Sequence, residues 1–274
     1  MPATSAAQRV YGEAFGVAEA QHYEQGFVPA IGAPFAAELV AAAALRGGER
    51  VLDVACGTGI VARLAADQVG PDGAVSGLDI NPAMLSVARS VAQSSGSRIK
   101  WYESSAEAMP LPDASFNVAF CQLGLMFMPD QKAAMREMRR VLVAGGRVLV
   151  STARPNALFD AMDAALARHI GPDAAAFVRQ VFSLPDPAVH ERLLHQAGFR
   201  DVQTRIEGKT IHLPPPRTFL RGYINATPLA PAVAQADPRR IAEMEREVET
   251  SWKPWAVDDG MAYRQEVAVA IGWV

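Results

Sequence analysis

The segment 51–66 constrains this chain more than any other part of the sequence. Its first residues, 51–55, form a short, mostly apolar run, as expected for a strand that is buried on both faces. Gly57 and Gly59 interrupt this run, and glycine allows positive φ and a close approach of a ligand to the backbone. A helix-forming run begins at Ile60. The order of strand, glycine loop and helix predicts an open α/β sheet with a ligand at the strand's carboxyl edge, beside backbone N–H groups and the positive end of a helix.

An acidic side chain inside this strand narrows the choice of ligand. Residues 57–62 also fit the relaxed dinucleotide pattern G-x-G-x-x-G/A. However, the carboxylate of Asp53, ahead of the loop, is unfavourable beside a pyrophosphate and favourable beside a cation or an ammonium group. The alternative is a glycine turn in some other doubly wound protein.

Three stretches of the chain resemble one family. The residues Asp53-Val54-Ala55-Cys56-Gly57-Thr58-Gly59 are similar to motif I of the class I S-adenosylmethionine-dependent methyltransferases. Residues 104–116 resemble that family's Gly-Asp-Ala-Glu-x-Leu-Pro-Phe-x-Asp-x-Ser-Phe segment, and Glu137, Arg140 and Gly145-Gly146 match a third, structural pattern. The similarity covers about residues 49–152, and the nearest-looking group contains ubiquinone/menaquinone-biosynthesis and small-molecule methyltransferases.

The resemblance implies both a fold and a cofactor. The implied fold is an α/β, doubly wound, Rossmann-like sheet of seven strands in the order 3-2-1-4-5-7-6, with the last strand antiparallel. The implied cofactor is S-adenosyl-L-methionine, with S-adenosyl-L-homocysteine as the product. The implied function is transfer of a methyl group to a small-molecule acceptor by an in-line SN2 reaction.

A second acidic residue supports an adenosine ligand. Asp79 stands twenty residues after Gly59, at the predicted end of the second strand, where a carboxylate can accept hydrogen bonds from both ribose hydroxyls. This spacing suits NAD enzymes equally well. Ser105 replaces the aspartate that meets the adenine amino group in the family, and a hydroxyl accepts that hydrogen bond without charge assistance. The predicted cofactor-binding residues are Asp53, Ala55, Cys56, Gly57, Thr58, Gly59, Asp79, Ile80, Met84, Ser105, Ala106, Glu107, Cys121 and Gln122.

The predicted acceptor site is poor in ionisable side chains. Many relatives place histidines where this chain has Met126 and Phe127, so we expect an apolar pocket. If the reaction needs a base, His22 or Tyr23 would supply it from the N-terminal segment that is expected to cover the site. No metal is expected, because the other histidines lack metal-ligand spacing. The predicted substrate-binding residues are Tyr11, Phe15, Met126, Arg154, Tyr223 and Trp252.

We expect the chain to divide into four parts. Residues 1–32 form an N-terminal helical arm, 33–213 the Rossmann-like cofactor-binding core, 214–260 a helical insert, and 261–274 the last strand of the core. A run of three prolines opens the insert, and proline fits neither a helix interior nor a central strand. The insert is either a lid over the acceptor or the contact surface of a homodimer.

Composition excludes several classes of function. A net charge of −3, with no block of like charges, argues against a nucleic-acid-binding protein. Two cysteines are too few for a disulfide framework. With no secretory signal and no long apolar run, we expect a cytoplasmic protein without a membrane span. Two alternatives stay open. One is an NAD-dependent oxidoreductase, which Asp53 and the lack of a Tyr-x-x-x-Lys pair disfavour, and the other is a non-catalytic S-adenosylmethionine-binding subunit.

Overall fold

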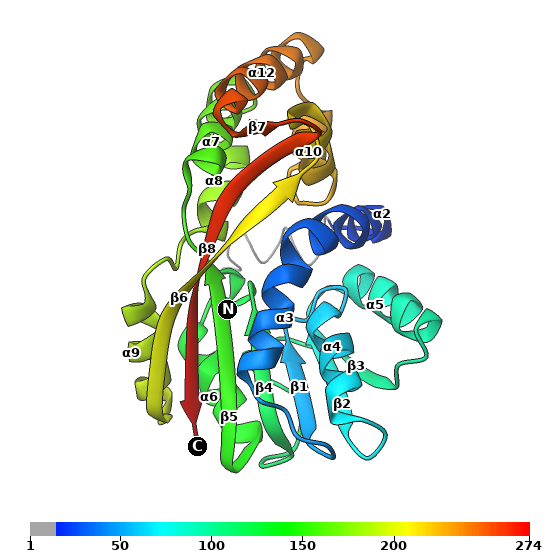
Figure 1. Ribbon diagram of the computed structural model, residues 1–274, viewed down its shortest axis with the longest axis vertical. Coiled ribbons are helices and arrows are strands. Elements are labelled where there is room, and N and C mark those ends of the chain that lie inside the picture. The colour runs from blue at the N-terminus through cyan, green and yellow to red at the C-terminus, as the bar shows by residue number, and fades with distance from the viewer. Residues whose placement is uncertain (1–14) are drawn as a thin grey trace, which may run out of the picture.

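The fold is a mixed sheet with helices on both faces, seen in a computed structural model that describes residues 15–274 (Figure 1). The strand order is β3-β2-β1-β4-β5-β8-β6, and the short β7 pairs with β8. β8 is antiparallel to both of its long neighbours, whereas β1 to β5 are parallel. The predicted order is therefore confirmed, with β8 as the seventh core strand. The strands are β1 Arg50–Val54, β2 Ala74–Asp79, β3 Ile99–Glu103, β4 Phe116–Gln122, β5 Leu142–Ala153, β6 Arg200–Leu213, β7 Ala256–Val257 and β8 Gly260–Trp273.

Alternate residues of the central strands enter two separate cores, as expected for a sheet covered on both faces. Val51 packs with the helices α3 (Ala33–Ala42) and α4 (Ile60–Val69). Leu52 packs on the other face with α6 (Gln131–Val141) and α9 (Pro187–Ala197). Between β2 and β3 runs α5 (Pro82–Ser94), which Asn81 caps by accepting the N–H of Met84 at 2.9 Å.

The two longest strands carry a second, helical lobe. β6 and β8 run on beyond the ends of the other strands, and helices cluster around their far ends (Figure 1). These helices are α7 (Ala157–His169), α8 (Pro172–Val181), α10 (Pro216–Asn225), α11 (Ala230–Ala234) and α12 (Pro238–Ser251). The lobe thus combines the predicted insert with the segment that follows β5. We call it the upper lobe.

Trp252 forms part of the core of the upper lobe. Its side chain is fully buried, and its Nε1–H donates to the carbonyl of Leu158 in α7 at 2.8 Å. Its ring also packs on Phe219 of α10, with 5.7 Å between ring centroids. The prediction of Trp252 as a substrate contact is therefore wrong, because the side chain joins the insert to α7 instead.

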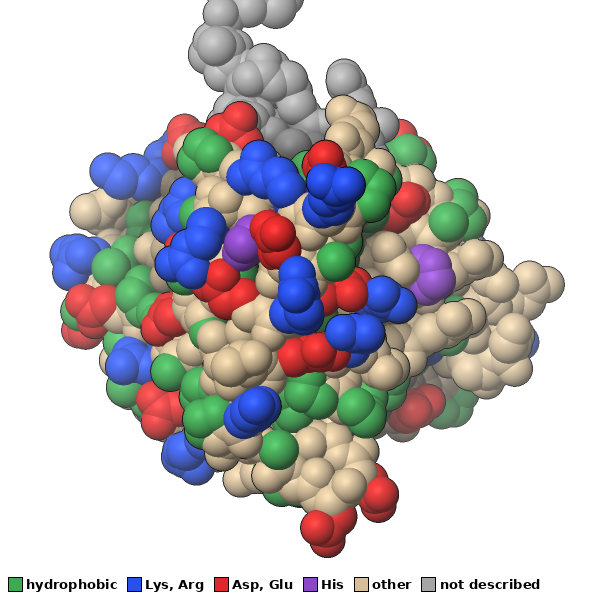
Figure 2. Space-filling model, turned by 90° about the horizontal axis from the view of Figure 1, so that it is seen from above, with side chains coloured by type: hydrophobic (Ala, Val, Ile, Leu, Met, Phe, Trp, Pro, Cys, Tyr) green, Lys and Arg blue, Asp and Glu red, His purple; other side chains and the backbone are tan. Residues whose placement is uncertain are grey.

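Charged side chains of both signs are interspersed on the outer surface seen from above (Figure 2). Several of them pair between helices of the upper lobe. Arg217 and Arg221 of α10 meet Glu249 and Glu245 of α12 at 2.7 and 2.6 Å. Exposed pairs of this kind contribute little to stability individually, so the lobe depends mainly on its apolar core.

One continuous helical segment, Val17–Ala42, links the N-terminal arm to the sheet. It consists of α2 (Val17–His22), the π-helix η1 (Tyr23–Gly32) and α3. Pro29 lies inside the π-helical stretch, where its missing N–H removes one regular helix hydrogen bond. By length and composition this is the one helix within residues 15–274 that could cross a membrane, which the sequence analysis did not anticipate. Its side chains Phe35 and Leu39 are buried in the core.

Substitution of Trp252 by Phe should lower the free energy of unfolding by about 2–4 kcal/mol, because it removes buried volume and the hydrogen bond to the Leu158 carbonyl. Urea denaturation would measure this loss. The matched control is Trp255→Phe, since Trp255 is only partly buried. Equal effects of the two substitutions would contradict the assigned role of Trp252.

Candidate functional site

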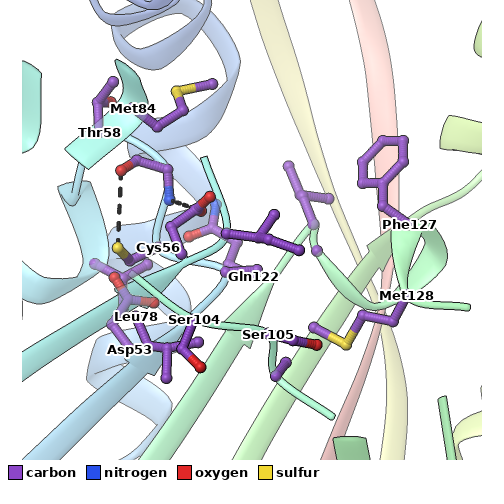
Figure 3. A pocket seen from close by; sticks show the side chains of 18 of the residues that line it. Asp53, Cys56, Thr58, Leu78, Met84, Ser104, Ser105, Gln122, Phe127 and Met128 are labelled. Carbon is purple, nitrogen blue, oxygen red and sulfur yellow. Dashed lines mark hydrogen bonds between the residues drawn. The ribbon is translucent and has the colours of Figure 1, made fainter. Parts of the chain in front are cut away.

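A cavity lies at the carboxyl edge of β1, β2 and β4, where the order of the sheet reverses (Figure 3). We call it the loop cavity. It holds about 1140 Å³ of empty space, part of which is open to solvent. Phe127 and Met128 lie on the side opposite Asp53 and Thr58 (Figure 3). Most of the predicted cofactor-binding residues line this cavity, namely Asp53, Ala55, Cys56, Gly57, Thr58, Asp79, Ile80, Met84, Ser105, Ala106, Glu107 and Gln122.

Gly59 does not line the cavity, which corrects the prediction of it as a cofactor contact. It has a φ of +84°, and a Cβ added to it would lie 2.4 Å from the Trp101 ring. Its N–H donates to the Cys56 carbonyl at 2.8 Å and so is not available to a ligand. Glycine is required here by the turn and by the packing of β3 against it.

Asp53 is a deeply buried carboxylate in the wall of the loop cavity. Its side chain is 1% exposed and accepts the N–H of Ala62, in the first turn of α4, at 3.0 Å. Burial, together with the neighbouring charge of Asp79, raises the pKa of Asp53 to about 8. A cation in the cavity would favour the charged form and lower this pKa.

Asp79 connects the end of β2 to the glycine loop. One carboxylate oxygen accepts the N–H of Gly57 at 2.8 Å, and the other accepts the N–H of Asn81 at 2.9 Å. Burial raises the pKa of Asp79 as well. Backbone N–H groups that the sequence analysis assigned to a ligand are thus partly used inside the protein.

Two further oxygens on lining residues have no hydrogen-bond partner among residues 15–274. They are Oγ1 of Thr58 and Oε1 of Gln122, and both are buried. The Gln122 amide is held in place because its Nε2 donates to the Gly32 carbonyl at 2.9 Å. Unpaired buried acceptors are costly. Together with Asp53 they suit a ligand that presents a positively charged donor, such as an ammonium group.

The loop after β3 forms another wall. The Ser105 hydroxyl accepts the N–H of Glu107 at 3.1 Å, and Glu107 accepts the N–H of Asp130 at 2.8 Å. Glu107 therefore also braces the loop against the start of α6. Ser104, next to it, lines the cavity and donates to the Ala108 carbonyl at 3.2 Å.

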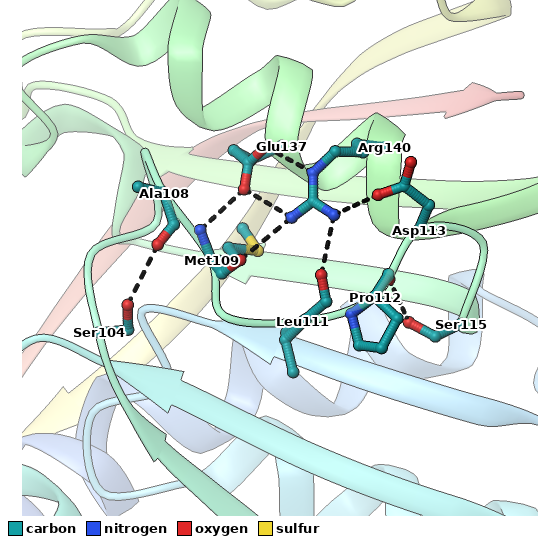
Figure 4. Close-up of polar contacts among 9 residues, drawn as sticks. All are labelled: Ser104, Ala108, Met109, Leu111, Pro112, Asp113, Ser115, Glu137 and Arg140. Carbon is teal, nitrogen blue, oxygen red and sulfur yellow. Dashed lines mark hydrogen bonds and ion pairs between the residues drawn. The ribbon is translucent and has the colours of Figure 1, made fainter.

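A partly buried ion-pair network fixes the far end of this loop (Figure 4). Glu137 pairs with Arg140 at 2.7 Å and accepts the N–H of Met109 at 2.7 Å. Arg140 also donates to the carbonyls of Leu111 and Met109 at 2.8 and 3.1 Å. The hydrogen bond from Arg140 holds the pKa of Glu137 below its usual range. Both residues thus stabilise the site without lining it.

A second cavity adjoins the first under the upper lobe. It holds about 640 Å³ of empty space, part of which is open to solvent, and is lined largely by aromatic side chains, so we call it the aromatic cavity. Tyr23, Leu123 and Phe127 line both cavities. The predicted substrate-binding residues Met126 and Tyr223 also line the aromatic cavity.

The remaining predicted site residues that the structure describes lie outside both cavities. His22 is exposed, because neighbouring residues on a helix face different directions and Tyr23 faces the cavities. Phe15 packs on Ala20 and Met84. Arg154 donates to the Pro185 carbonyl at 2.7 Å and lies 3.3 Å from Glu266. Cys121 is fully buried in the core shared with α6, because strand alternation turns it away from the side that Gln122 faces. Tyr11 lies outside the described residues.

Sequence reasoning missed several lining residues. Leu123 has a φ of +52°, although it is not glycine, and nothing in the sequence indicates this conformation. For Gly124 the glycine itself was the available sequence signal. The structure explains it, because a Cβ there would lie 2.6 Å from that of Ala55. The aromatic side chains of α7 and α8 that line the aromatic cavity, Phe159 and Phe177, were not among the predicted site residues. The other missed residues of the loop cavity are Gly32, Ile60, Val61, Leu78, Ser104, Phe127, Met128 and Pro129.

Comparison with known proteins relates residues 51–146 to a family model described as a methyltransferase domain. The ubiquinone/menaquinone biosynthesis C-methyltransferase UbiE of Methylobacterium nodulans is 34% identical over 171 residues, which is 57% of this chain and 68% of that protein. UbiE of Xanthomonas axonopodis pv. citri is 45% identical over 113 residues, covering 40% of this chain. The chain spans less than half of the length of that second relative, 45%.

A solved structure supports the fold over nearly the whole chain. Phosphoethanolamine N-methyltransferase 2 of Haemonchus contortus, in complex with S-adenosyl-L-methionine, superposes with a TM-score of 0.62 at 16% identity. The match covers 99% of this chain and 60% of that one. At this level of identity the likeness concerns the fold alone.

Substitution of Arg140 by Met should lower the free energy of unfolding by about 1–3 kcal/mol, because it leaves Glu137 and two loop carbonyls without their donor. Hydrogen exchange should increase across residues 104–116, and thermal denaturation should show the loss. Arg136→Met, on the exposed face of the same helix, is the control. Unchanged exchange in that loop would exclude the bracing role.

Proposed function

We propose a methyl-transfer function on the premise that this chain belongs to the class I S-adenosylmethionine-dependent methyltransferases, in the UbiE-like group. The reaction moves a methyl group from S-adenosyl-L-methionine to a small-molecule acceptor. The observation that carries the proposal is the set of buried acceptor oxygens on Asp53, Thr58 and Gln122, which all belong to residues that line one cavity.

The loop cavity fits the cofactor in both charge and polarity. Asp53, Thr58 and Gln122 would bind the ammonium group of its methionine part. Asp79 would accept hydrogen bonds from the ribose hydroxyls. The adenine would lie beside Met84 and Ser105, with Ile80 and Ala106 as further lining residues. When bound, the cofactor supplies a methyl group that is already activated as a sulfonium.

The chain's own residues contribute mainly by positioning the acceptor and excluding water. The aromatic cavity meets the loop cavity at Tyr23, Leu123 and Phe127, so an acceptor there would face the cofactor. His22 cannot act as a base in this conformation, since it is exposed and lines neither cavity. Burial raises the pKa of the Tyr23 hydroxyl, which keeps it neutral and makes it a hydrogen-bond donor.

The insert serves this function better as a lid than as a homodimer contact. Tyr223 of α10 and the following Thr227 line the aromatic cavity, so the insert closes the acceptor site within one chain. We place the reaction in the cytoplasm, on a freely diffusing small molecule.

The experiment that tests the function measures two quantities on the purified full chain. Calorimetry tests the binding of S-adenosyl-L-homocysteine, and transfer of label from methyl-labelled S-adenosyl-L-methionine to a panel of acceptors tests catalysis. Binding without transfer to any acceptor would favour a non-catalytic subunit. Failure to bind the nucleoside would refute the proposal.

Substitution of Asp79 by Asn should weaken the binding of S-adenosyl-L-homocysteine by about 1–3 kcal/mol, because it removes a buried, charged hydrogen-bond acceptor. Isothermal titration calorimetry would give both dissociation constants. Asp72→Asn, in an exposed turn, serves as the control. Unchanged affinity of the Asp79 variant would remove this residue from the binding site.

Binding of the same ligand should be coupled to the loss of a proton from Asp53. Because the pKa of Asp53 is about 8 without a cation, binding an ammonium group below that pH requires its deprotonation. The dissociation constant should therefore fall as the pH rises from about 6 to 8, by up to about tenfold per unit, and then level off. Calorimetry in two buffers with different ionisation enthalpies would detect the released proton. The pH dependence should flatten in Asp53→Asn, and a profile that this substitution leaves unchanged would assign the titration to another group.

A further inference from the structure

The walls of the aromatic cavity come mostly from parts of the chain outside the methyltransferase-domain match. Among its described lining residues, only Leu123, Met126 and Phe127 fall within residues 51–146. The others belong to the N-terminal helix, to the last residue of β5 (Ala153) and to the segments that follow β5, including the upper lobe and β8. The chemistry of the acceptor must therefore be derived from this chain's own side chains.

The described lining residues include no Asp, Glu, Lys, Arg or His. Gln265, which is polar, already has partners: its Oε1 accepts from Asn156 at 2.7 Å, and its Nε2 donates to the Arg154 carbonyl at 3.0 Å. The Thr227 hydroxyl donates to the Tyr223 carbonyl at 2.8 Å. A charged acceptor would lose its hydration here without gaining a counter-ion, which is strongly unfavourable.

Two tyrosine hydroxyls remain available as donors. No hydrogen bond joins the hydroxyl of Tyr23 or of Tyr223 to any other residue in the described part of the chain, and both residues line the aromatic cavity. Aromatic contacts hold their rings: Tyr23 stacks on Phe27 with 4.8 Å between centroids, and Tyr223 packs against Phe159 in a tilted arrangement at 5.3 Å. Burial raises the pKa of both hydroxyls, so each stays protonated. A buried hydroxyl without a partner favours a ligand that carries an acceptor oxygen.

We propose that the aromatic cavity selects an uncharged, mostly apolar acceptor and orients it through hydrogen bonds from Tyr23 and Tyr223 to one of its oxygens. This inference rests on the proposed function, because the aromatic cavity is an acceptor site only if the protein transfers methyl groups. Carboxylates, phosphates and ammonium compounds are disfavoured, because no described lining residue offers a counter-ion. Tyr23 adjoins both cavities, so the bound oxygen lies near the junction with the loop cavity.

Three probes of nearly equal shape test this selectivity. Acetophenone carries a carbonyl, isopropylbenzene has no oxygen, and benzoate carries a charge. Their binding to the full chain, saturated with S-adenosyl-L-homocysteine, is measured by ligand-observed NMR. Acetophenone should bind at least about tenfold more tightly than benzoate, and about three- to tenfold more tightly than isopropylbenzene. Equal or tighter binding of benzoate, or no binding of acetophenone, would overturn the inference.

Tyr223→Phe tests the hydroxyl itself. It should reduce the preference for acetophenone over isopropylbenzene, because only the Tyr23 donor remains, while leaving the affinity for isopropylbenzene unchanged; Tyr23→Phe combined with Tyr223→Phe should abolish the preference. The control is Tyr102→Phe, because Tyr102 lies on β3 and lines neither cavity. If the Tyr223 variant keeps the preference, the assignment of this donor is refuted. The affinity for S-adenosyl-L-homocysteine is measured on every variant, so a failure of the cofactor site is recognised separately. If a variant does not bind S-adenosyl-L-homocysteine, the three probes are titrated into the protein without it. Loss of the preference for acetophenone then supports the inference, and an unchanged preference refutes it.

Discussion

A buried carboxylate held by a single backbone N–H is the constraint on which the site depends. Asp53 has almost no exposed surface, and the Ala62 N–H at the start of α4 donates to it. One such hydrogen bond does not compensate for the lost hydration of a buried charge. The charged form of Asp53 is therefore disfavoured, and its pKa is raised. A cationic ligand would favour the charged form. The unpaired oxygens of Thr58 and Gln122 each lack a hydrogen-bond donor. An ammonium group would supply both the positive charge for Asp53 and the donors for these two oxygens.

The N-terminal helix connects the loop cavity, which Asp53 lines, to the aromatic cavity. Glu24 pairs with Arg63 of α4 at 2.8 Å, and Arg63 donates to the Thr58 carbonyl in the glycine loop. Further along the same helix, the Gly32 carbonyl accepts from Gln122. Tyr23, directly before Glu24 on this helix, lines both cavities. The N-terminal helix therefore forms a wall of both the loop cavity and the aromatic cavity.

Local sequence patterns predicted the sheet and much of the cofactor side because those features depend on neighbours in sequence. The glycine loop, Asp53 and Asp79 each lie at a strand end, and a parallel sheet brings such ends together. Trp252 and Arg154 were misassigned because their partners, Leu158 and Glu266, are fixed only by tertiary packing. His22 and Cys121 were misassigned by one position: the phase of a helix turns His22 outward, and the alternation of a strand turns Cys121 into the core.

The extension of β6 and β8 beyond the rest of the sheet has an evolutionary consequence. These strands and the chain after β5 carry the upper lobe, whereas the glycine loop lies on β1 and the start of α4. Mutations in the lobe can thus alter the shape of the acceptor cavity while the sulfonium-binding half keeps its geometry. New substrate preferences can therefore arise by mutation of the upper lobe, while the part that contains the glycine loop is inherited unchanged.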